Sequence, residues 1–152
     1  MTETALTLEK NDGTEEFTLK SNQVRTALSA STTIKAVLSA VGGLAGASPV
    51  LAKETYQIEV VLKDVEAEDY PNSSTYESEP VNPHNYGMHN ELHRAFKEWG
   101  PTVGDGFDTL HYDGRDIGGM ITDLQLSEDR SEDTSRQYTG MIEWSHVSVY
   151  IG

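Results

Sequence analysis

The sequence predicts a mainly β fold with one amphipathic α-helix, and three patterns support this prediction. Apolar and polar residues alternate over several stretches, most regularly at 56–63, as in strands with one buried face. The stretch 86–99 alone has the apolar spacing of a helix. The run 36–52, AVLSAVGGLAGASPVLA, has no charge in a chain in which 24% of residues are charged. At 152 residues, the chain is expected to form a single domain, 1–152, with one core.

The first part of the chain predicts a β-hairpin followed by a long arm. The stretches 4–10 and 14–20 alternate at period two and flank Asn11-Asp12-Gly13, which is a tight-turn sequence. Residues 22–34 alternate again, with small or polar side chains on one side. This pattern indicates a long exposed strand or extended arm that leads into the uncharged run.

The uncharged run 36–52 predicts a loop that lies against another subunit. It is shorter than the roughly 20 apolar residues that a membrane-spanning helix needs. Its three glycines and Pro49 also disfavour a core helix, since each glycine costs about 1 kcal/mol relative to alanine. An apolar loop on a solitary monomer would promote aggregation, so we expect a neighbouring subunit to cover it.

An acidic loop and the helix come next. Residues 66–85 contain three of the five prolines and no hydrophobic period, which predicts a loop with a role of its own. The helix, 86–99, is expected to start at an Asn85 cap and to end at Gly100-Pro101. Its expected buried stripe is Met88, Leu92, Ala95, Phe96 and Trp99. Its expected outward residues are Glu91, Arg94, Lys97 and Glu98.

Three more strands are predicted at 106–112, 117–126 and 138–150, with SEDRSEDTSR (127–136) as a solvated connection. The last strand has apolar residues on both sides. One side has Met141, Val147, Val149 and Ile151, and the other has Ile142, Trp144 and Tyr150. Such a strand is expected to face the core on one side and a neighbouring subunit on the other.

The charge of the chain restricts its surroundings and its partners. Twenty-five acidic and eleven basic residues give a formal net charge of −14. Self-repulsion of this size is screened within about 3 Å at 1 M salt, so a halophilic setting is favoured over a calcium-binding or a disordered acidic protein. The dispersed basic residues predict no tight DNA binding, whereas the acidic surface suits a duplex that slides past. The N-terminus has no secretory signal pattern, and no membrane partner is expected.

No motif predicts catalysis, so we expect a protein that is not an enzyme and that has no metal or cofactor. The chain has no cysteine. His89 and His93 stand one helical turn apart, with His84 upstream, but HNELH differs from the HExxH zinc pattern because Glu91 lies on another face. The glycine-rich 42–46 stretch is not followed by the Lys-Ser/Thr of a phosphate loop.

The overall layout resembles the tail tube proteins of long-tailed, siphovirus-like viruses. The features that agree are the starting β-hairpin, the arm with its uncharged loop, the strand pair beside one amphipathic helix, and the final strand GMIEWSHVSVYIG. The similarity in residue pattern is greatest in two stretches, GGMITDLQLSED (118–129) and TGMIEWSHVSVYIG (139–152). With the acidity, this resemblance points to a virus of halophilic archaea and to the β-sandwich or barrel of the tail tube type.

The resemblance implies a structural virion protein made in the host cytoplasm. Such proteins self-assemble into stacked, hexameric rings through which viral DNA is delivered, in contact with tape measure, terminator and baseplate proteins. The implied subunit-interface residues are Leu38, Val41, Gly42, Gly43, Leu44, Gly46, Val50, Leu51, Met141, Trp144, Val147, Val149 and Tyr150. The implied lumen residues are Glu15, Glu59 and Asp123.

Three alternatives stay open on the sequence. The chain is also consistent with a tail terminator, a distal tail ring or a baseplate protein, which share the fold and differ in how their rings stack. A halophilic β-sandwich binding module would use Tyr70, Tyr76, Tyr86 and the acidic loop, and it would be a monomer. A metal-dependent hydrolase would use His84, His89 and His93 and would contain stoichiometric zinc.

Overall fold

The computed structural model describes residues 4–21, 23–30, 49–79, 82–129 and 136–151. In these residues it has seven strands, one α-helix, α2 (Pro83–Glu98), and two short 3₁₀ helices, η1 (Ala67–Asp69) and η2 (Ser73–Tyr76). The strands are β1 (Thr4–Glu9), β2 (Glu16–Ser21), β3 (Val24–Ala30), β4 (Pro49–Leu62), β5 (Asp108–Tyr112), β6 (Arg115–Asp129) and β7 (Gln137–Ile151). The predicted mainly β fold with one helix is confirmed.

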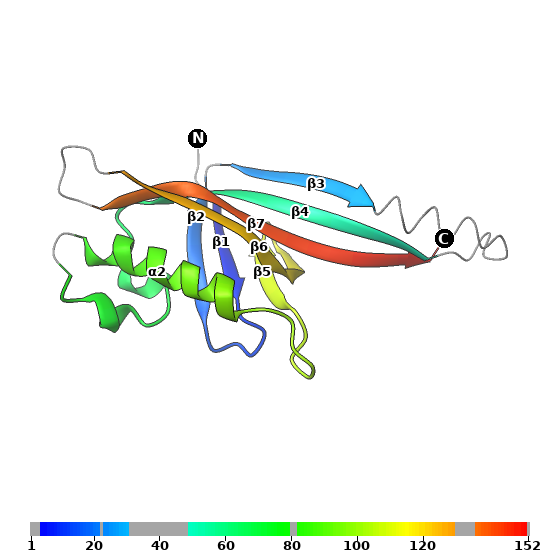
Figure 1. The fold of residues 1–152 in the computed structure, drawn as a ribbon, viewed down its shortest axis with the longest axis horizontal. Coiled ribbons are helices and arrows are strands. Elements are labelled where there is room, and N and C mark those ends of the chain that lie inside the picture. Colours follow the sequence, from blue (N-terminus) through cyan, green and yellow to red (C-terminus); the bar gives the residue numbers. More distant parts are fainter. Residues whose placement is uncertain (1–3, 22, 31–48, 80–81, 130–135, 152) are drawn as a thin grey trace.

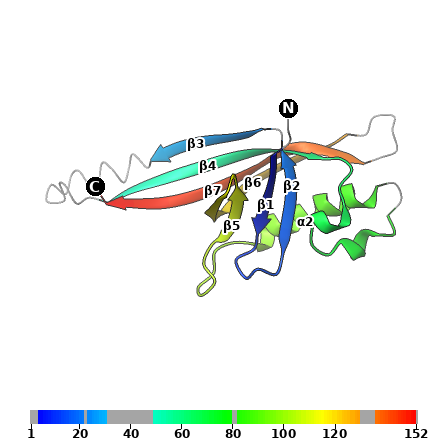
Figure 2. The same ribbon diagram turned by 180° about the vertical axis from the view of Figure 1, so that it is seen from behind.

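All seven strands belong to one antiparallel sheet with the order β2-β1-β5-β6-β7-β4-β3. Strand β6 joins two parts of this sheet, because residues 115–119 pair with β5 and residues 120–129 pair with β7. We call 120–129 of β6, together with β7, β4 and β3, the long-strand layer. This layer crosses β1 and β2, and its far end extends beyond the rest of the molecule (Figures 1 and 2).

The sheet is open, with β2 and β3 at its edges. A single chain therefore does not form the closed barrel that belongs to the tail tube type. The expected sandwich or barrel of the tail tube type stays a prediction; the structure has one open sheet, in which the short strands and α2 lie on one side of the long-strand layer (Figure 1).

The core lies between the long-strand layer, the short strands and α2. Each strand contributes alternate residues to it, as period-two burial requires. Fully burying one large apolar side chain stabilises the fold by about 1.5–3 kcal/mol. The fully buried large side chains are Trp144, Tyr56, Phe17, Leu6, Leu8, Leu19, Ile58, Leu62, Met88, Leu92, Leu110 and Ile142.

Helix α2 begins earlier than predicted. Its cap is Asn82, whose side chain accepts a hydrogen bond from the backbone N–H of Asn85, and Pro83 occupies the first turn. Asn85, the predicted cap, is instead buried inside the helix. Its side chain accepts from the Val65 backbone N–H (3.0 Å) and donates to the Arg136 carbonyl (2.7 Å), so it joins the helix to the residue before the acidic segment and to the residue before β7.

The buried face of α2 is also rotated from the predicted one. Met88, Leu92, Ala95 and Trp99 are buried as expected, whereas Phe96 is 41% exposed. Glu91, predicted to face outward, is only 3% exposed. The rotation is tolerated because the Glu91 carboxylate has hydrogen-bond partners inside the fold, which offset the cost of burying a charge.

Several predicted boundaries also need correction. Residues 49–52 of the expected loop belong to β4, and residues 36–48 lie outside the described residues. The acidic segment 66–85 is not a plain loop, since it contains η1, η2 and the first turn of α2. Strand β6 continues to Asp129, and the rest of the predicted connection up to 135 lies outside the described residues. The predicted first hairpin is confirmed, with Leu6 opposite Leu19 and Leu8 opposite Phe17.

A test of this packing is Gly87→Ala in α2. A Cβ atom at Gly87 would lie 2.4 Å from the Tyr70 hydroxyl oxygen, which is itself held by His84. We expect the added methyl group to lower the free energy of unfolding by about 1–3 kcal/mol, as overpacking does. Denaturant unfolding measures this change.

The matched control is Gly118→Ala in β6, where the nearest atom is the Phe107 Cβ at 3.6 Å and the new methyl group fits. If both variants unfold at the same denaturant concentration as the wild type, the close packing of Tyr70 on α2 is contradicted.

Candidate functional site

The long-strand layer has one core face and one exposed polar face. Alternation along β4 sends Tyr56, Ile58 and Val60 into the core, so the residues between them point the opposite way. We call this second surface the polar face. Its residues include Gln23, Arg25, Thr55, Gln57, Glu59, Asp123, Gln125, Thr139, Met141 and Glu143, and the apolar Val61, 39% exposed, lies on the same side.

Strand register places four residues of the polar face in one row across the layer. Arg25 of β3 pairs with Gln57 of β4, Gln57 pairs with Glu143 of β7, and Glu143 pairs with Asp123 of β6. The row therefore has a guanidinium at the β3 edge and two carboxylates at the β6 edge. The row is thus positively charged at one edge of the layer and negatively charged at the other.

A bulge in β6 is needed for this row. The register of β6 on β7 shifts between Ile121 and Asp123, which leaves Thr122 as the extra residue. The Thr122 hydroxyl donates to Glu143 Oε1 (2.7 Å) and lies 2.8 Å from Ser145 Oγ. The bulge thus brings Asp123 onto the same face as Glu143 and holds the Glu143 carboxylate in place.

A shallow hollow of about 220 Å³ lies on the polar face near the β3 edge. Arg25 lines it and is exposed, and its guanidinium has no hydrogen bond or ion pair with the residues that the structure describes. The other residues of the hollow are Gln23, Gln57, Glu59, Gly140 and Met141. The other charged side chains described on this face are carboxylates, so an arginine with no partner among the described residues is a group available to a binding partner.

Both edges of the long-strand layer lack a second strand partner among the described residues. Strand β3 pairs with β4 alone. Residues 120–129 of β6 pair with β7 alone, because β5 stops at the part of β6 before them. Each edge therefore presents backbone N–H and C=O groups that another chain is able to pair with.

Two of the three predicted lumen residues lie on the polar face. Glu59 is exposed there, and Asp123 is half-buried beside Gln125, whose side chain donates to it at 2.9 Å. Glu15 does not belong to this face. It precedes β2, and its carboxylate is an ion-pair partner of Arg94 within the body of the molecule, so the lumen role expected for Glu15 was wrong.

The predicted interface residues are divided among three places. Val50 and Leu51 pair with Tyr150 and Val149, so the structure brings these four and nearby Val147 together at the far end of the long-strand layer (Figure 1). Met141 lies on the polar face. Trp144 is 0% exposed within the chain's own core, so its side chain has no surface for a subunit contact, and this expectation is corrected. The remaining six, Leu38, Val41, Gly42, Gly43, Leu44 and Gly46, lie outside the described residues.

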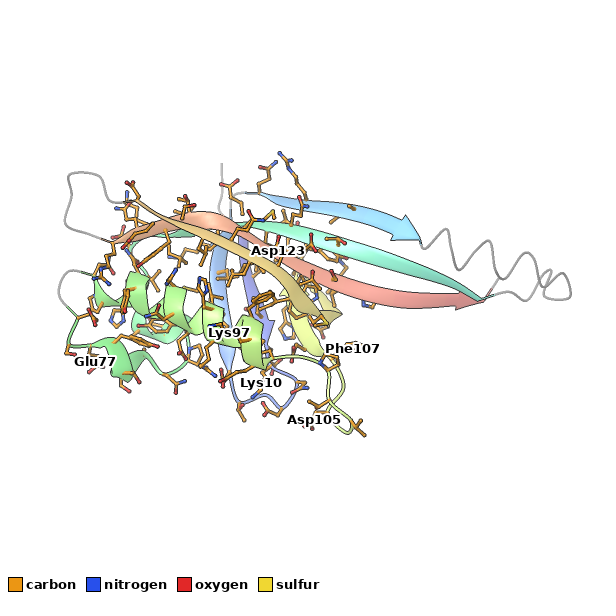
Figure 3. The ribbon with its side chains drawn as sticks, in the orientation of Figure 1. Lys10, Glu77, Lys97, Asp105, Phe107 and Asp123 are labelled. Carbon is orange, nitrogen blue, oxygen red and sulfur yellow. The ribbon has the colours of Figure 1, made fainter. Side chains whose placement is uncertain are left out.

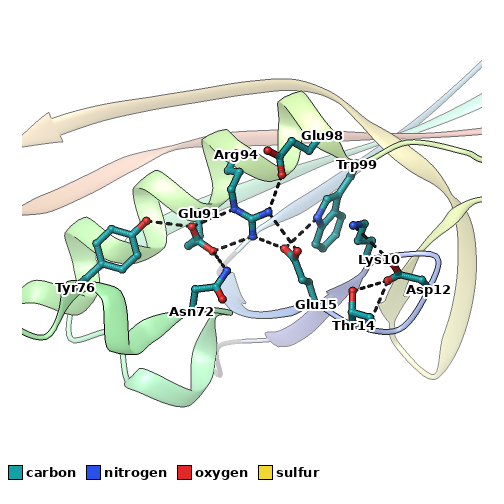
Figure 4. Close-up of polar contacts among 10 residues, drawn as sticks. All are labelled: Lys10, Asp12, Thr14, Glu15, Asn72, Tyr76, Glu91, Arg94, Glu98 and Trp99. Atoms are coloured by element: carbon teal, nitrogen blue, oxygen red, sulfur yellow. Dashed lines mark hydrogen bonds and ion pairs between the residues drawn. The ribbon is translucent and has the colours of Figure 1, made fainter.

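The side of the molecule that carries α2 has a polar network centred on Arg94 (Figure 4). The Arg94 guanidinium donates to Glu91, to Glu98 (2.8 Å) and to Glu15. The Trp99 indole N–H also donates to Glu15, at 3.4 Å. The network ties the β1–β2 turn to both the middle and the end of α2.

Glu91 is the buried carboxylate of this network. Besides Arg94, it accepts from the Asn72 amide (2.9 Å) and the Tyr76 hydroxyl (3.0 Å), which come from the acidic segment (Figure 4). Burial alone would raise the pKa of Glu91, but the hydrogen bonds from Arg94, Asn72 and Tyr76 outweigh it and lower that pKa. Glu91 therefore stays ionised and acts as an anchor for the segment.

The structure brings together the three tyrosines of the alternative binding site. The ring centroids of Tyr70 and Tyr76 lie 6.3 Å apart, and those of Tyr76 and Tyr86 lie 6.2 Å apart. Their polar groups are used internally, since the Tyr70 hydroxyl contacts His84 (2.8 Å) and the Tyr76 hydroxyl donates to Glu91. Burial raises the pKa of both Tyr70 and Tyr76 to about 12. The cluster packs the acidic segment onto α2.

Two of the three histidines of the alternative metal site lie together, since the ring centroids of His89 and His93 are 4.5 Å apart. His84 is held by Tyr70, and His89 stacks on Tyr138 with 4.2 Å between ring centroids. The pKa of His93 is lowered by burial and by the neighbouring His89 and Lys97. Among the residues that the structure describes, no three His, Cys, Asp or Glu side chains are grouped to hold a metal ion.

Arg25 and Glu143 were missed as candidate site residues. A signal for Arg25 was present, since it is the only basic residue in the alternating stretch 22–34. The signal for Glu143 was hidden, because it stands between the apolar residues Ile142 and Trp144. Asp105 and Phe107, on the loop before β5, lie on the other side of the long-strand layer from Asp123 (Figure 3).

Comparison with protein-family models, curated proteins and solved structures found no match. The geometry of the long-strand layer is therefore the basis for assigning a function. None of the helices in the described part of the chain is long and apolar enough to span a membrane.

The network around Arg94 predicts an effect on stability. Replacing Arg94 with Met leaves the buried Glu91 carboxylate without its cation, and we expect the free energy of unfolding to fall by about 2–3 kcal/mol at neutral pH. The exposed helix position Lys97→Met is the matched control. Equal stability of the two variants in denaturant unfolding would contradict the anchoring role.

The same network predicts an acid dependence. Because the folded-state pKa of Glu91 is below its ordinary value of 4.5, its contribution is complete above about pH 4.5 and is lost as the pH falls through the folded value. Unfolding experiments at a series of pH values should show Glu91→Gln to be less stable than the wild type near pH 7. The difference should shrink on acidification, and a constant difference would contradict this assignment.

Proposed function

We propose that this protein is the structural subunit of a virus tail tube, which self-assembles into stacked, hexameric rings that deliver viral DNA. The observation that supports this most is the long-strand layer. It is apolar on the face that packs on the body and mostly polar on the other face, and within the described residues neither of its edges has a second strand partner. A layer with these properties is suited to join identical layers side by side into a closed wall.

The strand directions are compatible with such a wall. In the order β3-β4-β7-β6, neighbouring strands are antiparallel, so β3 and β6 run in opposite directions. If copies are related by rotation about the ring axis, β6 of one copy meets β3 of the next in antiparallel orientation. The number of strands per copy is even, so the pattern repeats around the ring for any number of subunits.

The polar face would then line the lumen. Glu59, Asp123 and Glu143 place carboxylates on it, whereas Arg25 is the one arginine or lysine among the strand residues whose side chains are described there. A lumen of this kind repels phosphate and lets DNA pass without binding tightly. The helix and the Arg94 network would lie on the outside of the ring.

The far ends of β4 and β7 supply the proposed contact between rings. Apolar residues gather there along the chain, at Val50, Leu51, Val149 and Tyr150, and the uncharged residues 36–48 adjoin them in sequence. The strands extend beyond the body in this direction (Figure 2). In a stack of rings, this end would reach the next ring and become covered.

A second candidate within the same class is a tail ring that does not stack on both sides, such as a terminator, distal tail or baseplate protein. It would use the same edges and the same polar face, and its partners would include tape measure and other tail proteins. The net charge of −14 favours a virus of halophilic archaea for either candidate, because molar salt screens repulsion between copies.

Electron microscopy of the purified chain tests the proposal. In molar salt, we expect the wild type to form tubes or stacked rings, since salt screens the repulsion between acidic subunits. Deletion of 42–46 should leave single rings by removing the proposed contact between rings. Single rings of the wild type would favour the terminator or baseplate alternative. A strictly monomeric chain at high concentration in molar salt would contradict ring assembly.

A further inference from the structure

We infer that the Arg25 guanidinium at the β3 edge of one copy binds the Asp123 carboxylate at the β6 edge of the next copy. This inference rests on the proposed function, and it names the contact that joins neighbouring subunits. Arg25 is exposed and has no hydrogen bond or ion pair with the residues that the structure describes. Asp123 is half-buried and accepts only from the neighbouring Gln125 in those residues.

The register of the layer places these two groups at the same level. Arg25, Gln57, Glu143 and Asp123 form one row perpendicular to the strands, with Arg25 and Asp123 at opposite ends. The inferred contact includes a register at the junction between copies: the sheet continues from β6 of one copy to β3 of the next so that the row extends into the next copy. Arg25 of that copy then stands directly opposite Asp123, where side chains of antiparallel neighbours lie about 5 Å apart.

The pair would also set the direction of assembly. At the level of this row, a contact of β3 with β3 would bring two Arg25 side chains together, and a contact of β6 with β6 would bring two Asp123 side chains together. Both arrangements place like charges opposite each other, which is unfavourable. Only the head-to-tail contact of β3 with β6 pairs opposite charges, and a head-to-tail contact is the kind that generates rings.

The inferred pair of Arg25 and Asp123 also removes an unpaired cation from the proposed lumen. An arginine left unpaired on the polar face would attract DNA phosphates, since guanidinium groups bind phosphate in a bidentate manner. Binding to Asp123 satisfies Arg25 and leaves the lumen with acidic groups, among them Glu59. The inferred contact therefore closes the ring and removes a binding site for the passing duplex.

Charge reversal of both partners tests the inference. Arg25→Asp and Asp123→Arg each place like charges at the contact, so we expect each to weaken association of the chain by at least about tenfold. The double variant restores an opposite-charge pair with the positions exchanged, and it should regain most of the wild-type association. Sedimentation velocity measures the assembled fraction at the lowest salt concentration at which the wild type assembles.

Matched controls make the same charge changes away from the contact. Lys97→Asp on the outer side of α2 and Asp105→Arg on the loop before β5 lie on exposed parts of the body (Figure 3). Both should assemble like the wild type. Thermal unfolding of every variant separates loss of the contact from loss of the fold.

The outcomes distinguish this inference from the function on which it rests. If the wild type does not assemble, ring formation is contradicted, and the inferred contact with it. If the wild type assembles and Arg25→Asp assembles equally well, the contact alone is overturned. The contact is also overturned if both single variants are folded but weakened and the double variant regains no association.

Discussion

The pairing of β4 with β7 is the constraint on which the rest of the structure depends. All 14 residues of β4 pair with β7, and they form the longest continuous ladder in the described residues. The alternation along this ladder directs Tyr56, Ile58, Ile142 and Trp144 into the core and leaves the opposite face polar. A shift of one residue would exchange the two faces, so burial of the aromatic side chains also fixes the exposed row of charges.

The two sides of the molecule use charge differently. On the side of α2, Glu91, Glu15 and Glu98 converge on Arg94, and this network stabilises the fold by holding the acidic segment and the β1–β2 turn against the helix. On the polar face, Arg25 and Glu59 are exposed, and Arg25 has no partner among the described residues. Charges that stabilise a monomer have ion-pair partners within the chain, whereas unpaired charges at strand edges are suited to direct the association of subunits.

The sequence was sufficient for elements defined by local periodicity. The first hairpin, the strand at 56–62 and the single helix were predicted because their side chains repeat at period two or 3.6. The rotation of α2 could not be predicted from the sequence, because burial of Glu91 depends on partners such as Asn72 and Tyr76, which only the fold brings near it. For the same reason Glu15 was misplaced, and the row that joins Arg25 to Asp123 is set by long-range register and by the bulge at Thr122.

The most direct test of the central claim, that β6 of one copy pairs with β3 of the next, is a disulfide between Gln23→Cys and Gln125→Cys in a chain that has no other cysteine. Within one chain these positions are separated by β4 and β7, roughly 14 Å apart, which is too far for a disulfide. Oxidation of the assembled double variant should yield a ladder of cross-linked oligomers. Neither single variant should form a product larger than a cross-linked dimer. Monomers alone after oxidation of an assembled sample would contradict this edge pairing.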